Sequence, residues 1–492
     1  MKRILMIVLA VLAMSTAVQA RKVTGKVISG KEKISGVIVT DGRNFTQTRS
    51  NGKFAFEIAD DAEFVYIVTP AGYAGDWSSG VPAFYQRAEG KDSFVFDLVK
   101  TDDSGDYSII AVSDPQTKTK KHFSQFSAEP MADLCEAAGG LEGAVAGIIL
   151  GDICWDSLEL LEDYKKEIVR TGVPFYPVVG NHDHELEAKG DLQTTAEYRK
   201  MMGPENYAFC LGKDVVIVLD NIIYDTQKKY KEGYAPHVLA FVEGLEELLP
   251  EDADLYIAQH GTTYRWFEKE RWVVSTTELL DIVKDRKVSF ISGHTHISNN
   301  MIYGENVVEH NVAAICAAWW DTYYCTDGTP CGYKVFTCKD GQLEWYYKPV
   351  GKEKDYQVEF FMPGESPLHP ECIVANVWDW DPAWKVEWFE DGRPMGVLEP
   401  VFDLSPNYIK DINAAFQGKK IPGYKQPRLN WHYFAAAPSK DAKTVKVVVT
   451  SRFGQKWECS VDMAEYAGVK AEPMAADLPE NAVQMLKDDG IF

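Results

Sequence analysis

Five strand-like apolar runs in the middle of the chain are each followed by side chains that can bind a metal ion. The runs begin at positions 108, 145, 175, 255 and 288, and the residues that follow them are Asp114, Asp152, Asn181 with His182, His260, and His294 with His296. The carboxyl ends of successive strands meet at one edge of an open α/β sheet, so these side chains are expected to converge. Four of the ten histidines belong to this set. Mixed carboxylate and imidazole groups suit Zn, Mn or Fe.

The elements that position these residues belong to a domain predicted over residues 104–352. Strand-like runs alternate there with helix-like segments, which indicates a layered α/β domain. Residues 21–103 show short alternating strands with Asn51-Gly52 turns, typical of antiparallel hairpins. Residues 353–492 return to strand-like runs. The expected fold is an α/β catalytic domain, with β-sheets covered by helices, flanked by N-terminal and C-terminal β-sandwich-like domains.

Four motifs carry a specific resemblance. They are Gly151-Asp152 with Asp156, Gly180-Asn181-His182-Asp183, the single His260, and Gly293-His294-Thr295-His296. In this order and spacing the chain resembles the calcineurin-like metallophosphoesterases over about half its length. The β-rich regions on both sides resemble the exported, three-part members of that family. The resemblance implies a metallophosphoesterase-type catalytic domain.

The family resemblance also implies a role for each ligand. Asp152 would bridge two divalent metal ions (Mn, Fe or Zn). Asp114 and His296 would bind the first ion. The second ion would be bound by Asn181, His260 and His294. Two such ions can hold a hydroxide between them for in-line attack on a phosphoryl group.

His182 is the expected catalytic residue. The resemblance implies that it protonates the leaving oxygen or stabilises the charge of the transition state. Asp183 would orient His182. For Asp156 and His184, a supporting role and a direct role are equally open.

One position departs from the family pattern. The first motif of the family usually reads Asp-x-His, whereas this chain has Asp114-Pro115-Gln116. Gln116 is expected to tune the first metal site as a neutral oxygen ligand. The alternative is that Gln116 only hydrogen-bonds a water molecule or the substrate phosphate.

Several aromatic and cysteine residues have two interpretations. The tryptophans of segment 378–388 are expected in a β-sandwich core or a domain interface, with a sugar-binding platform as the alternative. Four aromatic residues after the motifs either line a substrate cleft or pack in the interior: Trp266, Trp319, Trp320 and Tyr323. The segment 325–338 holds three cysteines, which could supply one disulfide.

Residues 1–20 have the pattern of a signal peptide. Lys2 and Arg3 precede an apolar run that starts at Ile4, and Ala20 is a small residue at the expected cleavage site. We therefore expect export to the periplasm or the extracellular space. No later stretch is apolar enough for a transmembrane helix.

The charge and the motifs together narrow the function. With 51 basic and 73 acidic residues, a general nucleic-acid-binding surface is not expected. The favoured hypothesis is a metal-dependent hydrolase of phosphate mono- or diesters, acting on a small-molecule, lipid or glycan substrate. The alternative is a carbohydrate- or surface-binding protein with a degenerate metal site. Another metallohydrolase, such as an amidase, lacks its HxHxDH or HExxH motif. The sequence does not predict an oligomeric state.

Overall fold

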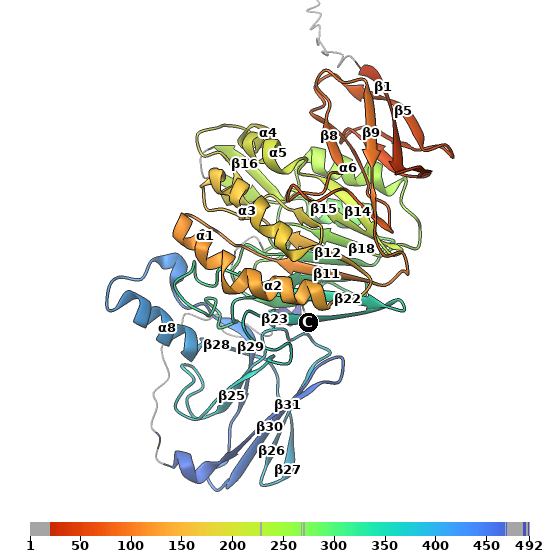
Figure 1. Ribbon diagram of the computed structural model, residues 1–492. Helices are drawn as coiled ribbons and strands as arrows, with labels where there is room; N and C mark the ends of the chain where they lie inside the picture. The colour runs from red at the N-terminus through yellow and green to blue at the C-terminus, as the bar shows by residue number, and fades with distance from the viewer. Residues whose placement is uncertain are drawn as a thin grey trace, which may run out of the picture.

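The computed structural model describes residues 20–226, 229–266, 268, 271–467, 469, 486–488 and 491. Apart from Ala20, the predicted signal peptide lies outside the described residues. Figure 1 shows three regions in succession: a small β-rich region in red, a central layered region, and a second β-rich region in blue. Within the described part, no helix is both long and apolar enough to cross a membrane.

The N-terminal region contains two four-stranded sheets. One has the order β2 (Glu32–Lys33), β1 (Ala20–Ser29) and β5 (Lys53–Ala59), with β9 (Ser93–Asp97) also paired to β1. The other has the order β4 (Phe45–Gln47), β3 (Ile38–Thr40), β6 (Phe64–Ile67) and β8 (Tyr85–Arg87). Two short strands, β7 (Tyr73–Ala74) and β10 (Val99–Lys100), pair with each other. Both larger sheets contribute to one core, through residues such as Val23 and Val65.

The central region holds two larger mixed sheets. The five-stranded sheet has the order β13 (Phe175–Pro177), β12 (Ala144–Ile149), β11 (Tyr107–Val112), β22 (Gly332–Lys339) and β23 (Gln342–Pro349). The six-stranded sheet has the order β14 (Tyr207–Leu211), β15 (Asp214–Val218), β18 (Leu255–Ala258), β19 (Val288–Ser292), β21 (Val307–Asn311) and β20 (Asn299–Ile302). Strands β13, β12 and β11 are parallel to one another, and so are β15, β18 and β19 in the other sheet. Their carboxyl ends therefore lie at one edge.

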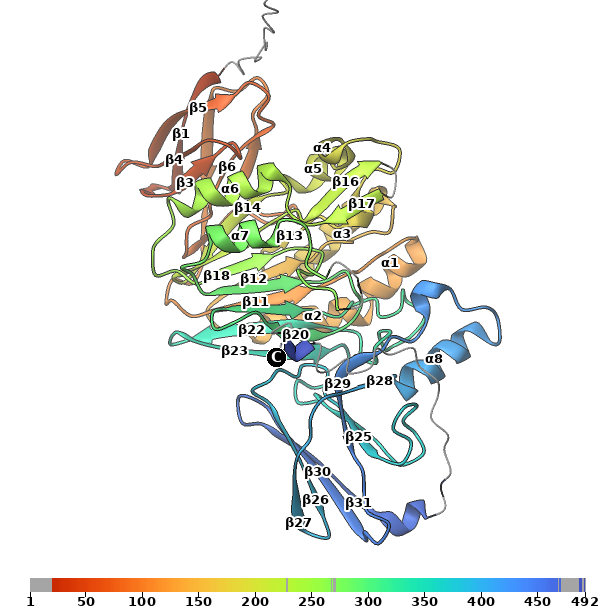
Figure 2. The same ribbon diagram turned by 180° about the vertical axis from the view of Figure 1, so that it is seen from behind.

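Helices cover the two sheets from opposite sides. Toward the viewer in Figure 1 lie α1 (Lys120–Ser127), α2 (Glu129–Gly140) and α3 (Leu161–Ile168). On the reverse side, seen in Figure 2, lie α6 (Pro236–Glu246) and α7 (Thr276–Ile282). Smaller elements follow β13, namely α4 (Asp191–Thr194), α5 (Ala196–Met202) and the hairpin of β16 (Ile222–Thr226) and β17 (Lys229–Glu232). The predicted layered α/β fold is confirmed.

The C-terminal region again has two four-stranded sheets. One has the order β24 (Glu359–Phe361), β25 (Ile373–Asn376), β29 (Asn430–Ala436) and β28 (Val401–Asp403). The other has the order β27 (Arg393–Val397), β26 (Lys385–Glu390), β30 (Thr444–Thr450) and β31 (Lys456–Asp462). Helix α8 (Pro406–Phe416) precedes β29. Trp378, Trp380 and Trp384 are buried, so they do not form an exposed sugar platform.

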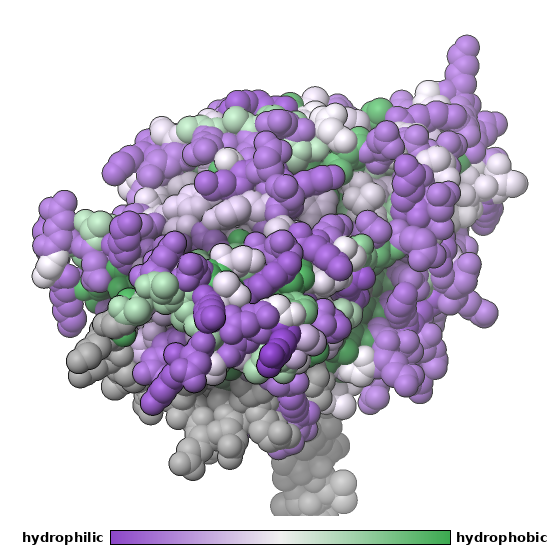
Figure 3. Space-filling view, turned by 90° about the horizontal axis from the view of Figure 1, so that it is seen from below, coloured by the Kyte–Doolittle hydropathy of each residue, from purple (hydrophilic) through white to green (hydrophobic). Residues whose placement is uncertain are grey.

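The face shown in Figure 3 is mainly hydrophilic, and the described cysteines form no disulfide. Figure 3 shows one face of the molecule, where hydrophilic residues dominate and hydrophobic ones form small patches. All nine cysteines lie in the described part, and each has a free thiol. The disulfide considered for Cys325, Cys331 and Cys338 does not form in this structure.

A buried carboxylate, Asp327, joins the catalytic and C-terminal regions. Its Oδ2 accepts hydrogen bonds from the backbone N–H of Ser298 at 2.9 Å, Asn430 Nδ2 at 2.9 Å and His432 Nε2 at 3.0 Å. Its Oδ1 accepts from the backbone N–H of Thr329 at 3.0 Å. Because β29 carries Asn430 and His432, and Ser298 lies between β19 and β20, this side chain links the C-terminal region to the central sheets.

Replacing Asp327 by Asn is expected to destabilise the protein by about 3 kcal/mol, since it removes a buried charge from a set of donors that remain. One carboxylate oxygen would become an amide N–H₂ that faces other donors. Thermal denaturation should show a clearly lowered Tm. Asp252→Asn, at an exposed aspartate, is the matched control. An unchanged Tm for Asp327→Asn would show that the interface does not depend on this carboxylate.

Candidate metal centre

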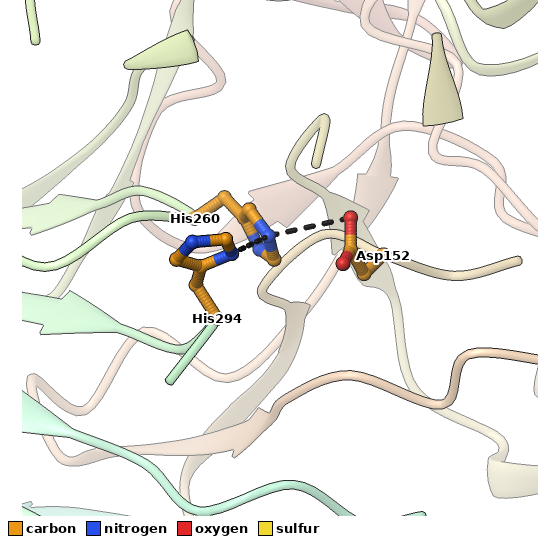
Figure 4. A group of neighbouring side chains, drawn as sticks. All are labelled: Asp152, His260 and His294. Atoms are coloured by element: carbon orange, nitrogen blue, oxygen red, sulfur yellow. Dashed lines mark hydrogen bonds and ion pairs between the residues drawn. The ribbon is translucent and has the colours of Figure 1, made fainter. Parts of the chain in front are cut away.

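The predicted ligands converge at the carboxyl ends of the parallel strands. Asp114 follows β11, Asp152 follows β12, and Asn181 lies in a short 3-10 helix after β13. From the second sheet, His260 follows β18, and His294 and His296 follow β19. Figure 4 shows Asp152, His260 and His294 pointing toward one another.

The backbone at these strand ends is strained. Five of the thirteen described non-glycine residues with a positive φ are predicted metal ligands: Asp114 (50°), Gln116 (39°), Asp152 (48°), His294 (69°) and His296 (54°). Such angles are uncommon outside glycine and cost free energy. Their concentration in one place indicates a functional site, where the surrounding structure holds side chains in a required direction.

The second-metal set is compact. The Nε2 atom of His260 lies 3.3 Å from Asp152 Oδ1 and 3.1 Å from Asn181 Oδ1. The Nδ1 atom of His294 lies 3.1 Å from the same His260 nitrogen. Ligand atoms of Asp152, His260 and His294 all lie within 4.8 Å of one another. Asp152, His260 and His294 therefore form a compact group, and Asn181 lies beside it through its contact with His260.

The first-metal set lies on the other side of Asp152. His296 Nε2 is 3.4 Å from Asp114 Oδ1. This nitrogen is buried and has no hydrogen-bond partner among the described residues, and the same holds for Gln116 Oε1. Buried polar atoms are rarely left without a partner. A bound cation would satisfy these atoms, so the residues present fit a metal ion here as well.

In His260, His294 and His296, the ring nitrogen that points away from the candidate centre makes a contact that fixes the direction of the ring. His260 Nδ1 donates to the carbonyl of Leu150 at 2.7 Å, and His296 Nδ1 donates to the carbonyl of Ala317 at 2.9 Å. His294 Nε2 lies 3.2 Å from the Glu232 carboxylate. Such contacts orient metal-binding imidazoles and set their tautomers. The remaining nitrogens face the candidate centre.

The negative charges of Asp152 and Asp114 favour a cation at this site. Burial lowers the pKa of His260, but the Asp152 carboxylate and its hydrogen bond, with Asp114, outweigh burial and raise that pKa to about 10. The two carboxylates stabilise a proton on the His260 ring, and a metal ion that binds this ring must displace that proton. Metal affinity is therefore expected to rise with pH.

Two glycines leave space for this arrangement. A Cβ at Gly180 would collide with the backbone nitrogen of Asp152, and a Cβ at Gly293 would collide with the hydroxyl of Ser113. These contacts explain why the glycines of two motifs stand directly before ligand residues. The chain passes too closely for any side chain.

His182 is held by Asp156, which corrects the expectation that Asp183 orients it. His182 Nδ1 donates to Asp156 Oδ1 at 2.8 Å, and 23% of the His182 side chain is exposed. Asp183 is buried and accepts backbone N–H groups of Gly180 at 3.0 Å and Cys154 at 3.2 Å. The two aspartates have separate roles: Asp156 holds the imidazole, and Asp183 fixes the two loops that carry ligands.

The pair of His182 and Asp156 leads to a prediction on pH dependence. Burial lowers the pKa of His182, but the charge of Asp152 and the hydrogen bond to Asp156 raise it more, so the net pKa lies above 6.5. Asp156→Asn removes one raising contribution. If His182 acts as an acid, the alkaline limb of the rate profile should move to lower pH.

The rate of Asp156→Asn at its optimum should also fall by about 10- to 100-fold, less than the loss of a positioned acid itself. Asp183→Asn is the comparison, since it should lower the Tm without moving the alkaline limb. A profile of Asp156→Asn that coincides with wild type would show that Asp156 does not support an acid.

Gln116 presents its amide nitrogen to the acidic residues. Its Nε2 donates to Asp152 Oδ2 at 2.6 Å and lies 3.4 Å from Asp114 Oδ1. In this orientation Gln116 is a hydrogen-bond donor to the bridging carboxylate. A 180° turn of the amide would present its oxygen instead. The predicted role as a metal ligand stays a prediction.

Replacing Gln116 by His is expected to tighten the weaker metal site by about 10-fold and to shift its preference toward Zn²⁺, because imidazole nitrogen is the stronger ligand. Calorimetric titration of wild type, Gln116→His and Gln116→Ala with Mn²⁺ and Zn²⁺ measures this change. If all three bind the weaker ion equally while Gln116→Ala loses activity, Gln116 contacts water or substrate and is no ligand.

The candidate centre opens into a cleft of about 430 Å³. Its lining includes five of the predicted ligands, but not Asp114 or His260. The other lining residues include His182, Tyr230, Glu232, Arg265, Glu268, Trp319, Tyr424 and Arg428. Of the four aromatic residues considered from the sequence, only Trp319 lines this cleft. Trp266 packs on Phe402, and the indole of Trp320 donates to the carbonyl of Pro115. Tyr323 donates to the carbonyl of Val350.

Two more residues, His184 and Glu232, lie near the candidate centre. His184 does not face the ligands: its Nδ1 donates to the carbonyl of Gly180 at 2.9 Å, and its ring stacks on Tyr224. Glu232, which the sequence prediction missed, is paired with Arg265 at 2.9 Å as well as with His294. No motif points to Glu232, because only the folded hairpin of β16 and β17 brings it to the site.

Family profiles that match the chain show its class, a metal-dependent phosphoesterase, which is a hydrolase. The family profile described as calcineurin-like phosphoesterase matches residues 107–298. The profiles of the N terminal and C terminal of calcineurin-like phosphoesterase match residues 21–101 and 309–457. The chain belongs to the calcineurin-like phosphoesterase family, in its three-part form.

Comparison with solved structures gives distant likenesses. The chain is similar to GAP50 of Plasmodium (14% identity, TM-score 0.34, covering 51% of this chain and 87% of that one). It is also similar to a dimetal phosphatase from Danio rerio (11% identity, TM-score 0.33, covering 50% of this chain and 99% of that one). A further likeness is to PhoD (9% identity, TM-score 0.34, covering 96% of this chain and 91% of that one). No curated protein sequence matches the chain.

Proposed function

We propose that this protein is an exported hydrolase of phosphate mono- or diesters that uses two divalent metal ions, Mn, Fe or Zn. The observation that carries the proposal is the position of the Asp152 carboxylate between the residues predicted for the first metal ion and those predicted for the second. Its Oδ1 lies 3.3 Å from His260 Nε2, and its Oδ2 lies 2.6 Å from Gln116 Nε2. One carboxylate can therefore serve both sets.

The residues of the cleft have definable tasks. When bound, two ions would lower the pKa of a water molecule and stabilise the charge on the phosphoryl oxygens. Asp156 occupies Nδ1 of His182, so Nε2 is the nitrogen available to a substrate. The oxygen of water forms a new bond to phosphorus while the bond between phosphorus and the ester oxygen breaks. His182 supplies the proton that the ester oxygen takes up.

Hydrolysis of a panel of esters tests this proposal. Metal-loaded protein is assayed with phosphate monoesters and diesters, including small-molecule, lipid and glycan esters, and chelator-treated protein is the control. We expect hydrolysis that depends on the metal. If metal-loaded protein hydrolyses no ester above the chelated control, the alternative of a binding protein with a degenerate metal site is favoured.

Export rests on the pattern of residues 1–20. Basic residues, an apolar run and Ala20 form the order that a signal peptidase recognises. Expression of the full chain in a bacterium, followed by N-terminal sequencing of the periplasmic fraction, should give a protein that begins at Arg21. Retention of the whole chain in the cytosol, with Met1 intact, would contradict export.

A further inference from the structure

The cleft over the metal centre is closed on one side by the C-terminal region. Segment 417–429 joins α8 to β29 and brings Tyr424 and Arg428 to the cleft. Arg428 donates from its guanidinium to the carbonyl of Thr295 at 3.1 Å. Because Thr295 lies between two predicted metal ligands, this contact fixes the segment directly beside the candidate centre.

An aromatic cluster extends from this segment to His182. Trp319 stacks flat on His296, with ring centroids 4.2 Å apart and 20° between the planes. Tyr424 stands edge-on to Trp319, at 4.7 Å and 80°. Trp155 lies 5.8 Å from Tyr424 and 5.4 Å from the ring of His182. The three rings therefore form a continuous aromatic cluster from His296 to His182.

Tyr424 is the ring of this cluster that is most open to a ligand. It is 43% exposed, whereas Trp319 is 9% exposed. Tyr424 lines the cleft together with His182, so its exposed ring is accessible to a molecule bound there. The backbone beside it is held firmly, since Tyr408 donates from its hydroxyl to the carbonyl of Lys425 at 2.7 Å. A ligand would therefore meet a ring that is already in place.

The position of this aromatic cluster relative to His182 indicates which part of a substrate would contact it. In-line displacement puts the leaving oxygen opposite the attacking one. The leaving oxygen must lie within reach of His182, the predicted proton donor. Because His182 and Tyr424 line the same cleft, the alcohol part of the ester would extend from His182 toward Tyr424.

We propose that Tyr424 is a specificity-determining residue that packs against a ring in the alcohol part of the substrate. The inference rests on the proposed phosphoesterase function and deepens it. An aromatic edge or face favours flat, partly apolar groups, which sugar rings and aromatic rings share. An acyclic alcohol offers little surface for such packing. The substrate class is thus a phosphate ester of a ring-bearing alcohol.

Hydrolysis of matched esters by wild type, Tyr424→Ala and Tyr424→Phe tests the proposal. Phenyl phosphate and glucose 1-phosphate carry an aromatic and a sugar ring, and ethyl phosphate carries none. For Tyr424→Ala, kcat/KM should fall by about 10-fold for at least one ring-bearing ester and change less than about 2-fold for ethyl phosphate. Tyr424→Phe, which keeps the ring, should stay near wild type. Which ring-bearing ester responds distinguishes an aromatic substrate from a sugar.

Equal losses for all three esters, or no loss for any, would overturn the proposal. Tyr73→Ala, in the N-terminal region, is the control for general effects of losing a tyrosine. Calorimetric binding of phenylphosphonate and methylphosphonate to metal-loaded protein separates this test from the proposed function, because phosphonates need no turnover. Weaker binding of phenylphosphonate alone by Tyr424→Ala supports the proposal even if no ester is hydrolysed. Unchanged binding of both phosphonates, together with unchanged kcat/KM for both ring-bearing esters, overturns it.

Discussion

Replacing Asp152 by Asn is expected to lower kcat by at least about 10³-fold, with bound metal falling below the content of wild type. A bridging metal ligand supports several kcal/mol of charge stabilisation in the transition state, and about 4 kcal/mol corresponds to three powers of ten in rate. The neutral amide keeps the shape of the side chain but loses the charge that both ions share. Kinetics and elemental analysis of the same preparations measure the two effects together.

The control for Asp152→Asn is Asp163→Asn, at an aspartate that pairs with Lys120 away from the cleft. This control should keep both activity and metal content. Activity of Asp152→Asn near that of wild type would exclude the bridging role. Full metal content with lost activity would place Asp152 on the substrate or the attacking water, not between the ions.

Replacing His182 by Ala is expected to lower kcat by about 10²–10⁴-fold, the usual weight of a positioned acid. Metal content and Tm should stay close to those of wild type. The structure supports this separation, because the His182 ring contacts Asp156 and Trp155, and no hydrogen bond links that ring to a predicted ligand side chain among the described residues.

The leaving group distinguishes the two roles considered for His182. A p-nitrophenolate leaves without a proton, whereas an alkoxide does not, so the loss in His182→Ala should be smaller for p-nitrophenyl phosphate than for an alkyl phosphate. Equal losses for both esters would exclude the acid role and leave only stabilisation of charge. Asn181, the neighbouring predicted ligand, offers a comparison: Asn181→Ala should lose metal as well as rate.

The sequence was sufficient to predict that the candidate ligand residues lie together, because strand ends are a local signal. A buried parallel strand appears as a short apolar run, and the rule that ligands gather at the carboxyl ends does not require knowing the strand order. Asp114, His260 and His294 could therefore be placed together, although two different sheets supply them. The alternation of runs and helices likewise predicted the layered central domain.

Other residues of the site depend on contacts that no local pattern encodes. Asp156 and Asp183 are both close to motif residues, and only the folded geometry shows which one reaches the His182 ring. Glu232 comes from a hairpin with no recognisable motif. Tyr424 and Arg428 reach the cleft from the C-terminal region, which Asp327 contacts through Asn430 and His432.

Titration of metal-free protein with Mn²⁺ tests the central claim most directly. Bound ions per chain and hydrolysis of a phosphate ester are measured on the same samples as Mn²⁺ is added. The two-ion centre predicts that activity rises until about two ions are bound per chain and then stays constant. Full activity with a single bound ion, or two bound ions without any hydrolysis, would contradict it.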